Sequence, residues 1–162
     1  MRNLLLAIAL IASGVHAEDW GPLQFLVGHW VGDGSGEPGK ASGEFSFAPD
    51  LQGKVLVRKS FAAYPPQNGK PAYRHDDLMI VYRDSDSRRL RAVFFDSEGH
   101  TIRYGISPAD GGVVFVSDGA GGQPRFRLTY TGAGKDRLKL TFEIAVPGKD
   151  FAKYLEASAH RE

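Results

Sequence analysis

Glycine recurs at every second position from Gly28 to Gly36, and the one exception in that series is Trp30. Because successive residues of a β-strand point to opposite faces, all of these positions would share one face. That face would be bare backbone with a single indole ring. Glycine weakens a strand and is usually kept where a sheet bends sharply or another group comes close. The stretch therefore predicts the first strand of a small closed antiparallel sheet, with Trp30 plugging or lining one end.

The N-terminus has the features of a secretory signal peptide. Arg2 supplies a positive charge, residues 4–12 form an apolar run, and a small residue, Ala17, ends the segment. The run is too short to span a bilayer. We expect cleavage after Ala17, which would leave one domain of residues 18–162 without a membrane anchor, in the periplasm or secreted. An uncleaved membrane anchor is the alternative.

The composition narrows the class of partner. Of the 20 Lys and Arg residues, one is Arg2, so the expected mature chain balances its 19 Asp and Glu residues, with histidine neutral. This balance is not typical of a protein that binds nucleic acid or an anionic membrane surface. The sequence has no cysteine, so an exported domain of this kind must depend on its core alone.

Short apolar runs separated by turn signals recur along the chain, at a spacing of about ten residues that is typical of all-β proteins. We expect ten strands, at residues 28–36, 42–48, 54–63, 77–83, 90–96, 100–106, 113–118, 125–131, 137–146 and 151–161. A short helical turn before them would cover one end of the sheet with Trp20, Phe25 and Leu26. An antiparallel up-and-down barrel leaves no exposed edges, and two packed sheets are the alternative.

Two of these runs, at residues 78–82 and 93–95, are apolar on both faces. Their outer faces are either covered by other parts of the chain or used in a homodimer contact.

The opening motif Gly28-x-Trp30-x-Gly32-x-Gly34-x-Gly36 resembles the first strand of the nitrobindin-like barrels, ten-stranded relatives of fatty-acid-binding proteins and lipocalins. The run from Tyr154 to Ser158, followed by Arg161, is similar to the last strand of that family. The resemblance covers both ends of the chain, and the middle only in strand number and turn spacing. It implies a calycin-type barrel with a hydrophobic cavity, as in exported bacterial members of unassigned function. Relatives of this architecture often bind carboxylates through inward arginines. One or two of the basic residues on the expected strands could do the same here: Arg58, Lys59, Arg83, Arg91, Arg103, Arg125 and Arg127.

The resemblance also implies haem as a candidate cofactor, held by a residue of the last strand. In haem-binding members a histidine in the last strand holds the iron, and this chain has Tyr154 at that position. A tyrosinate can hold ferric haem, so haem is the cofactor that the resemblance implies if Tyr154 replaces the usual ligand. Alternation along the strand places Leu155 and Ala157 on the face opposite Tyr154, and a dry inner face would prefer those two.

Aromatic residues of the expected strands are candidates for the wall of the cavity. They are Trp30, Phe45, Phe61, Tyr82, Phe94, Tyr104 and Phe142. The alternative is that they fill the barrel as an ordinary core.

The histidines after residue 17 fall into two pairs at opposite ends of the expected barrel: His29 with His160, and His75 with His100. Two imidazoles make half of a zinc site. The acids that could complete the pairs are Glu18, Asp19 or Glu156 for the first and Asp76, Asp77 or Asp96 for the second. Because no close spacing such as His-x-x-x-His is present, surface histidines without metal are the first expectation.

The hairpin from Asp96 to His100 carries two acids and a histidine, which suits acid–base chemistry. No nucleophile motif accompanies it, so we assign no catalytic residue. We expect an exported, non-enzymatic barrel that binds a hydrophobic small molecule. The alternatives are a haem protein that uses Tyr154 and a structural or interaction module with a filled barrel.

Overall fold

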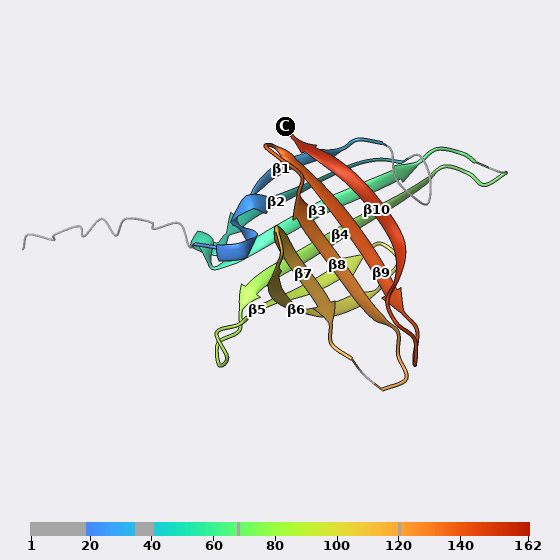
Figure 1. Cartoon of the computed structure of the whole chain (residues 1–162). Coiled ribbons are helices and arrows are strands. Elements are labelled where there is room, and N and C mark those ends of the chain that lie inside the picture. Colours follow the sequence, from blue (N-terminus) through green and yellow to red (C-terminus); the bar gives the residue numbers. More distant parts are fainter. Residues whose placement is uncertain (1–18, 35–40, 68, 120) are drawn as a thin grey trace, which may run out of the picture.

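The computed structural model describes residues 19–34, 41–67, 69–119 and 121–162. The expected signal peptide, Glu18 and the far end of the glycine series lie outside the described residues. Within the described part of the chain, the strands pair in antiparallel fashion into a single closed barrel (Figure 1). The prediction of an all-β up-and-down barrel is confirmed, and the alternative of two packed sheets is wrong.

The barrel follows a short 3-10 helix, η1 (Gly21–Leu26), and a second one, η2 (Leu51–Gly53), connects two strands. The strands are β1 (Gly28–Gly32), β2 (Ser42–Asp50), β3 (Val55–Tyr64), β4 (Tyr73–Arg83), β5 (Leu90–Asp96), β6 (Thr101–Ala109), β7 (Gly112–Ser117), β8 (Arg125–Gly132), β9 (Arg137–Ala145) and β10 (Ala152–Arg161). Each strand pairs with the next along the chain, and β1 pairs with β10 to close the ring.

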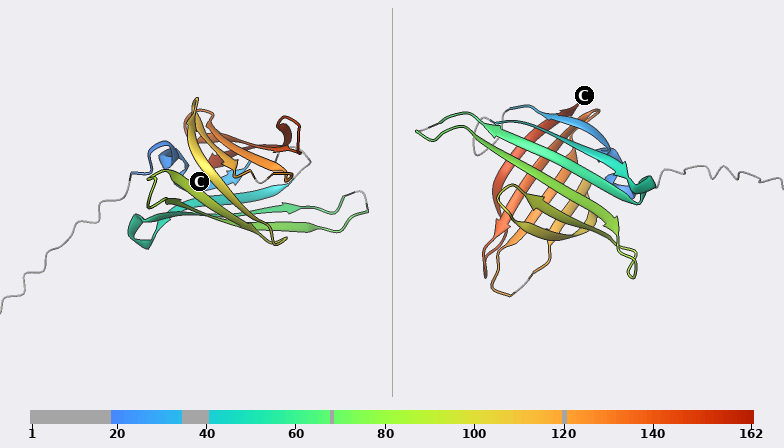
Figure 2. Two further views of the ribbon diagram at one scale, coloured as in Figure 1. Left: turned by 90° about the horizontal axis from the view of Figure 1, so that it is seen from below. Right: turned by 180° about the vertical axis from the view of Figure 1, so that it is seen from behind.

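Strand β5 has the predicted bounds, whereas β4 begins at Tyr73 instead of residue 77. The difference arises because β3 and β4 continue to pair beyond the end of β5, as far as Tyr64 opposite Tyr73. The rings of these two tyrosines stack with centroids 6.1 Å apart. Figure 2 shows this hairpin projecting beyond the rest of the barrel.

Helix η1 closes one end of the barrel. Trp20, Leu23 and Leu26 are at most 1% exposed, and Trp30 Nε1 donates a hydrogen bond to the Leu26 carbonyl at 2.8 Å. The prediction that this segment covers one end of the sheet is confirmed. Leu23 is the residue that sequence analysis left out, while Phe25 is half-buried and packs against the core.

The seam between β1 and β10 explains the opening glycine. Gly28 has a φ of +134°, and a Cβ at this position would collide with Nη1 of Arg161. The Arg161 guanidinium lies 4.3 Å from the Trp30 ring and donates hydrogen bonds to the carbonyls of Val27 and Phe25 at 2.6 and 2.9 Å. Gly28 therefore makes room for a cation that holds β10, β1 and η1 together.

Burial of the interior changes along the barrel axis. Near η1 the inward side chains are almost completely buried: Trp30, Phe47, Leu56, Val81, Val113 and Leu138 are at most 2% exposed. Toward the opposite end they are only half-buried: Phe94, Ile102, Phe126, Phe142 and Leu155. We call this second end, where β3, β5, β7 and β9 finish, the mouth. The barrel is filled and capped at the η1 end, and its inward side chains are less buried toward the mouth.

None of the helices in the described ranges is long and apolar enough to cross a membrane.

Candidate functional site

A buried charged pair lies between the filled half of the barrel and the mouth. Arg58 of β3 is 6% exposed and forms a salt bridge with Asp77 of β4, whose side chain is 7% exposed. The guanidinium also lies 5.4 Å from the ring of Phe45. Burial of a charge is costly unless the charge is paired and hydrogen-bonded, so this pair is a feature that an ordinary apolar core would lack.

Tyr130 of β8 completes this group. In the ranges that the structure describes, one side-chain atom of Tyr130 and one of Arg58 have no hydrogen-bond partner. Burial raises the pKa of Tyr130 to about 12, although the nearby Arg58 charge opposes the rise. Burial alone would lower the pKa of Arg58, but Tyr130 and Asp77 raise it, so the guanidinium stays charged. Among the described residues, neither Tyr130 Oη nor Arg58 Nε has a partner with hydrogen-bond geometry. The two side chains lie near one another, and a hydrogen bond between them helps to raise the pKa of Arg58, but neither of these two donor atoms has an acceptor in full hydrogen-bond geometry among those residues.

The predicted wall residues divide between the two faces of the sheet. Trp30, Phe45 and Tyr104 are buried in the core, and Phe94 and Phe142 pack against it. Phe61 and Tyr82 lie on the outer face of the sheet. Phe61 alternates in β3 with the inward residues Ser60 and Ala62. Tyr82 alternates in β4 with the inward residues Val81 and Arg83. Phe61 instead stacks under the exposed Arg74 at 3.9 Å. Five of the seven predicted positions therefore face the interior.

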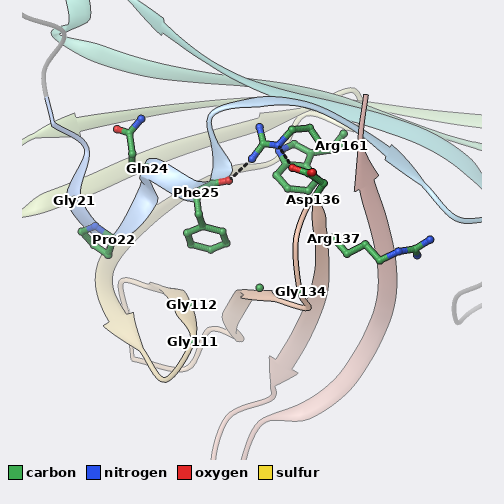
Figure 3. A pocket seen from close by; sticks show the side chains of 12 residues that line it. Gly21, Pro22, Gln24, Phe25, Gly111, Gly112, Gly134, Asp136, Arg137 and Arg161 are labelled. Carbon is green, nitrogen blue, oxygen red and sulfur yellow. Dashed lines mark hydrogen bonds and ion pairs between the residues drawn. The ribbon is translucent and has the colours of Figure 1, made fainter.

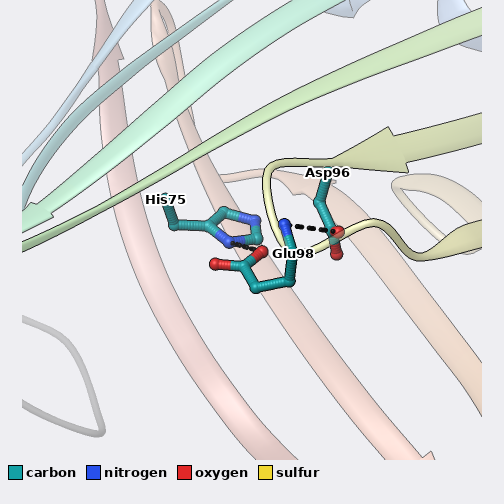
Figure 4. A group of neighbouring side chains, drawn as sticks. All are labelled: His75, Asp96 and Glu98. Atoms are coloured by element: carbon teal, nitrogen blue, oxygen red, sulfur yellow. Dashed lines mark hydrogen bonds and ion pairs between the residues drawn. The ribbon is translucent and has the colours of Figure 1, made fainter.

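Histidine and acidic residues meet at the mouth, as the topology predicted for the second histidine pair. His75 begins this group on β4, and its Nδ1 lies 2.8 Å from Glu98 of the β5–β6 turn, while Nε2 lies 3.7 Å from Asp77. Asp96 at the end of β5 contacts Nδ1 of His100 at 2.8 Å through Oδ2. Figure 4 shows His75 and Glu98 pointing toward one another, with Asp96 beside them.

The first histidine pair does not form a site. His29 lies 3.3 Å from both Glu44 and Glu162, whereas His160 Nδ1 contacts Asp33 at 2.7 Å. Each imidazole thus has its own acidic neighbours on the outer surface.

Tyr154 lies at an irregular point of β10, where the pairing with β9 shifts between Lys153 and Leu155. Its side chain is 59% exposed and meets the edge of the Phe142 ring at 6.2 Å. Downstream of the shift, Leu155 and Ala157 pair with inward residues of β9. This placement does not suit a haem ligand directed into the barrel, and the function proposed below has no step through haem.

The surface has a cleft of about 550 Å³ beside η1. It is lined by Phe25 and by glycines of the β6–β7 and β8–β9 turns, with Arg161 and Asp136 on one side (Figure 3). The charges here are already paired: Arg161 binds Asp136 at 3.3 Å, and Arg137 points away from the cleft toward Asp33. The cleft therefore offers a ligand few free polar groups.

A scan against protein-family models finds no match, and a search of curated proteins finds none either. The closed ten-stranded barrel is compatible with a calycin-like fold.

Arg58 was one of seven strand residues considered from the sequence for inward binding of a carboxylate, but it was not singled out among them. Tyr130 was not proposed as a site residue. Tyr130 alternates with polar residues on a strand with one dry face, which is a usable signal for an inward phenol. Arg58 had no such signal, because both faces of β3 start with apolar residues, Val55 and Val57 on one and Leu56 on the other.

Proposed function

We propose that this protein is an exported, non-enzymatic barrel that binds a small apolar molecule with one hydrogen-bond-accepting end, such as a carboxylic acid. The apolar part would lie among the half-buried side chains of the mouth, and the accepting end would meet Arg58 and Tyr130. The observation that carries this proposal is the pair of buried donor atoms without an acceptor, Arg58 Nε and Tyr130 Oη.

Buried donors without a partner carry an energetic cost that a bound ligand would remove. A buried polar group without a hydrogen bond costs about 1–3 kcal/mol, so buried donors in native proteins almost always have a partner. An acceptor delivered by a ligand would remove this cost at two atoms together. Apolar walls with a few convergent polar groups are typical of small-molecule sites, and the mouths of β-barrels are a common place for them.

The test is a calorimetric titration of the purified protein with dodecanoate, below the concentration at which it forms micelles. We expect saturable binding. Tyr130→Phe removes only the hydroxyl, so we expect it to cost about 0.5–1.5 kcal/mol, the net worth of one hydrogen bond. That corresponds to binding about two- to tenfold weaker.

Tyr73→Phe is the matched control, because Tyr73 is 49% exposed on the projecting hairpin and should leave the affinity unchanged. Absence of saturable binding would favour the alternative of a filled barrel with a structural or interaction role. Equal effects of the two substitutions would place the ligand elsewhere.

Export is tested separately, by expressing the full chain and measuring the mass of the product outside the cytoplasm. We expect a chain that begins at residue 18. A product of full length would contradict cleavage after Ala17.

A further inference from the structure

We propose that the mouth of the barrel binds a divalent transition-metal ion through His75, Asp96 and Glu98. This inference does not rest on the proposed small-molecule function, because its residues and its test are different. One ligand atom from each of the three side chains lies within 4.8 Å of the other two. They come from two separate parts of the chain, the start of β4 and the β5–β6 turn, which the barrel topology brings together.

The spacing is close to that of a bound metal. Zinc binds imidazole nitrogen and carboxylate oxygen at about 2.0–2.2 Å in tetrahedral geometry, which places neighbouring ligand atoms roughly 3.3–3.6 Å apart. From a separation of 4.8 Å, a contraction of about 1.2–1.5 Å would complete the site, while His75 Nδ1 and Glu98, at 2.8 Å, would move slightly apart. Three protein ligands would leave a fourth position open.

Backbone contacts hold the ligand-bearing turn in place. Oδ1 of Asp96 accepts hydrogen bonds from the backbone N–H groups of Glu98 and His100 at 3.1 and 2.8 Å. The N–H of Ser97 donates to the Asp76 carbonyl at 2.9 Å, which ties the turn to β4. Oδ2 of Asp96 already contacts Nδ1 of His100 at 2.8 Å, so a metal ion would bind this oxygen beside His100 or take the place of that contact.

The charges at the mouth also favour a cation. Asp77, Asp96 and Glu98 are three carboxylates, and Arg58 forms its salt bridge with Asp77 alone among them. The two carboxylates that remain match the charge of a divalent ion. Because imidazole suits zinc, cobalt and nickel better than calcium or magnesium, the expected class is a transition metal of zinc type.

A different arrangement fits part of the same geometry. A protonated His75 could donate to Glu98 from Nδ1, at 2.8 Å, and face Asp77 with Nε2, at 3.7 Å, with no metal. Metal binding and this ion-pair cluster predict opposite results in the following titration.

The experiment is a titration of the chelator-treated full chain with Co²⁺, followed by the visible absorption of the cobalt ion. We expect one equivalent to bind and Zn²⁺ to displace it. His75→Gln and Glu98→Gln should each weaken Co²⁺ binding by at least about tenfold, since even second-shell changes at metal sites cost 10–100-fold. Glu98 is in a turn, so its substitution tests the site even if His75→Gln disturbs folding.

His29→Gln is the matched control, because His29 also lies between two carboxylates but on the outer surface. It should leave Co²⁺ affinity unchanged. Zn²⁺ should also raise the melting temperature of the wild-type protein and not that of Glu98→Gln. Absence of saturable cobalt absorption, or an equal loss in His29→Gln and His75→Gln, would overturn the metal site.

Discussion

The Tyr130 phenol gives the interior a specific dependence on alkaline pH. Its pKa in the folded protein is raised to about 12, against about 10 in an unfolded chain. Above about pH 10 the unfolded state loses this proton while the folded state keeps it, so the free energy of unfolding should fall as pH rises toward 12. Two pKa units correspond to at most about 3 kcal/mol.

Urea unfolding of Tyr130→Phe between neutral and alkaline pH checks this argument. We expect the variant to lose less stability than the wild type as pH rises, because it has no proton to release at this position. Some of the decline will remain, since burial also raises the pKa of Tyr104. Parallel curves for the two proteins would contradict the assignment, and Tyr73→Phe should follow the wild type.

At the scale of one element, η1 acts as the plug of the barrel. Leu23 belongs to η1 and is fully buried. Its replacement by Ala should lower the free energy of unfolding by about 2–5 kcal/mol, as for other buried leucines. Urea unfolding measures the change. Leu51→Ala is the control, because Leu51 is 67% exposed and its substitution should stay within about 0.5 kcal/mol. Similar effects at both positions would mean that η1 contributes little to the core.

Some features of the strands could be predicted from the sequence and others could not. Alternation and turn residues placed the strands well, and the hairpin order predicted that His75 and His100 would lie at the same end of the barrel. The inward direction of the Arg58 side chain could not be predicted, because β3 is apolar on both faces and the alternation of residue types there does not show which face points inward. The irregular pairing at Tyr154 was equally invisible, since a shifted register leaves no mark in a short run of residues.

At the scale of the whole molecule, the inward side chains of the barrel are fully buried near η1 and half-buried near the mouth. The glycine series and Trp30 predicted a plugged end, and the partial burial of Phe94 and Phe142 shows that the opposite end is less tightly covered. Packing of this kind concentrates stability near η1. The proposed metal site and the apolar part of the proposed ligand site lie at the less buried end, whereas Arg58 and Tyr130 lie in the core above it.

Hydrogen exchange of the intact protein should show this gradient along single strands. In β4, amides near Met79 and Val81 should exchange much more slowly than those near His75, because the first group opens only when the core opens. Zn²⁺ should slow exchange around His75 and in the β5–β6 turn, whereas dodecanoate should slow it around Arg58 and Phe142. Leu23→Ala should instead speed exchange at the η1 end. Uniform protection along β4 would contradict a core that is more tightly packed near η1 than near the mouth.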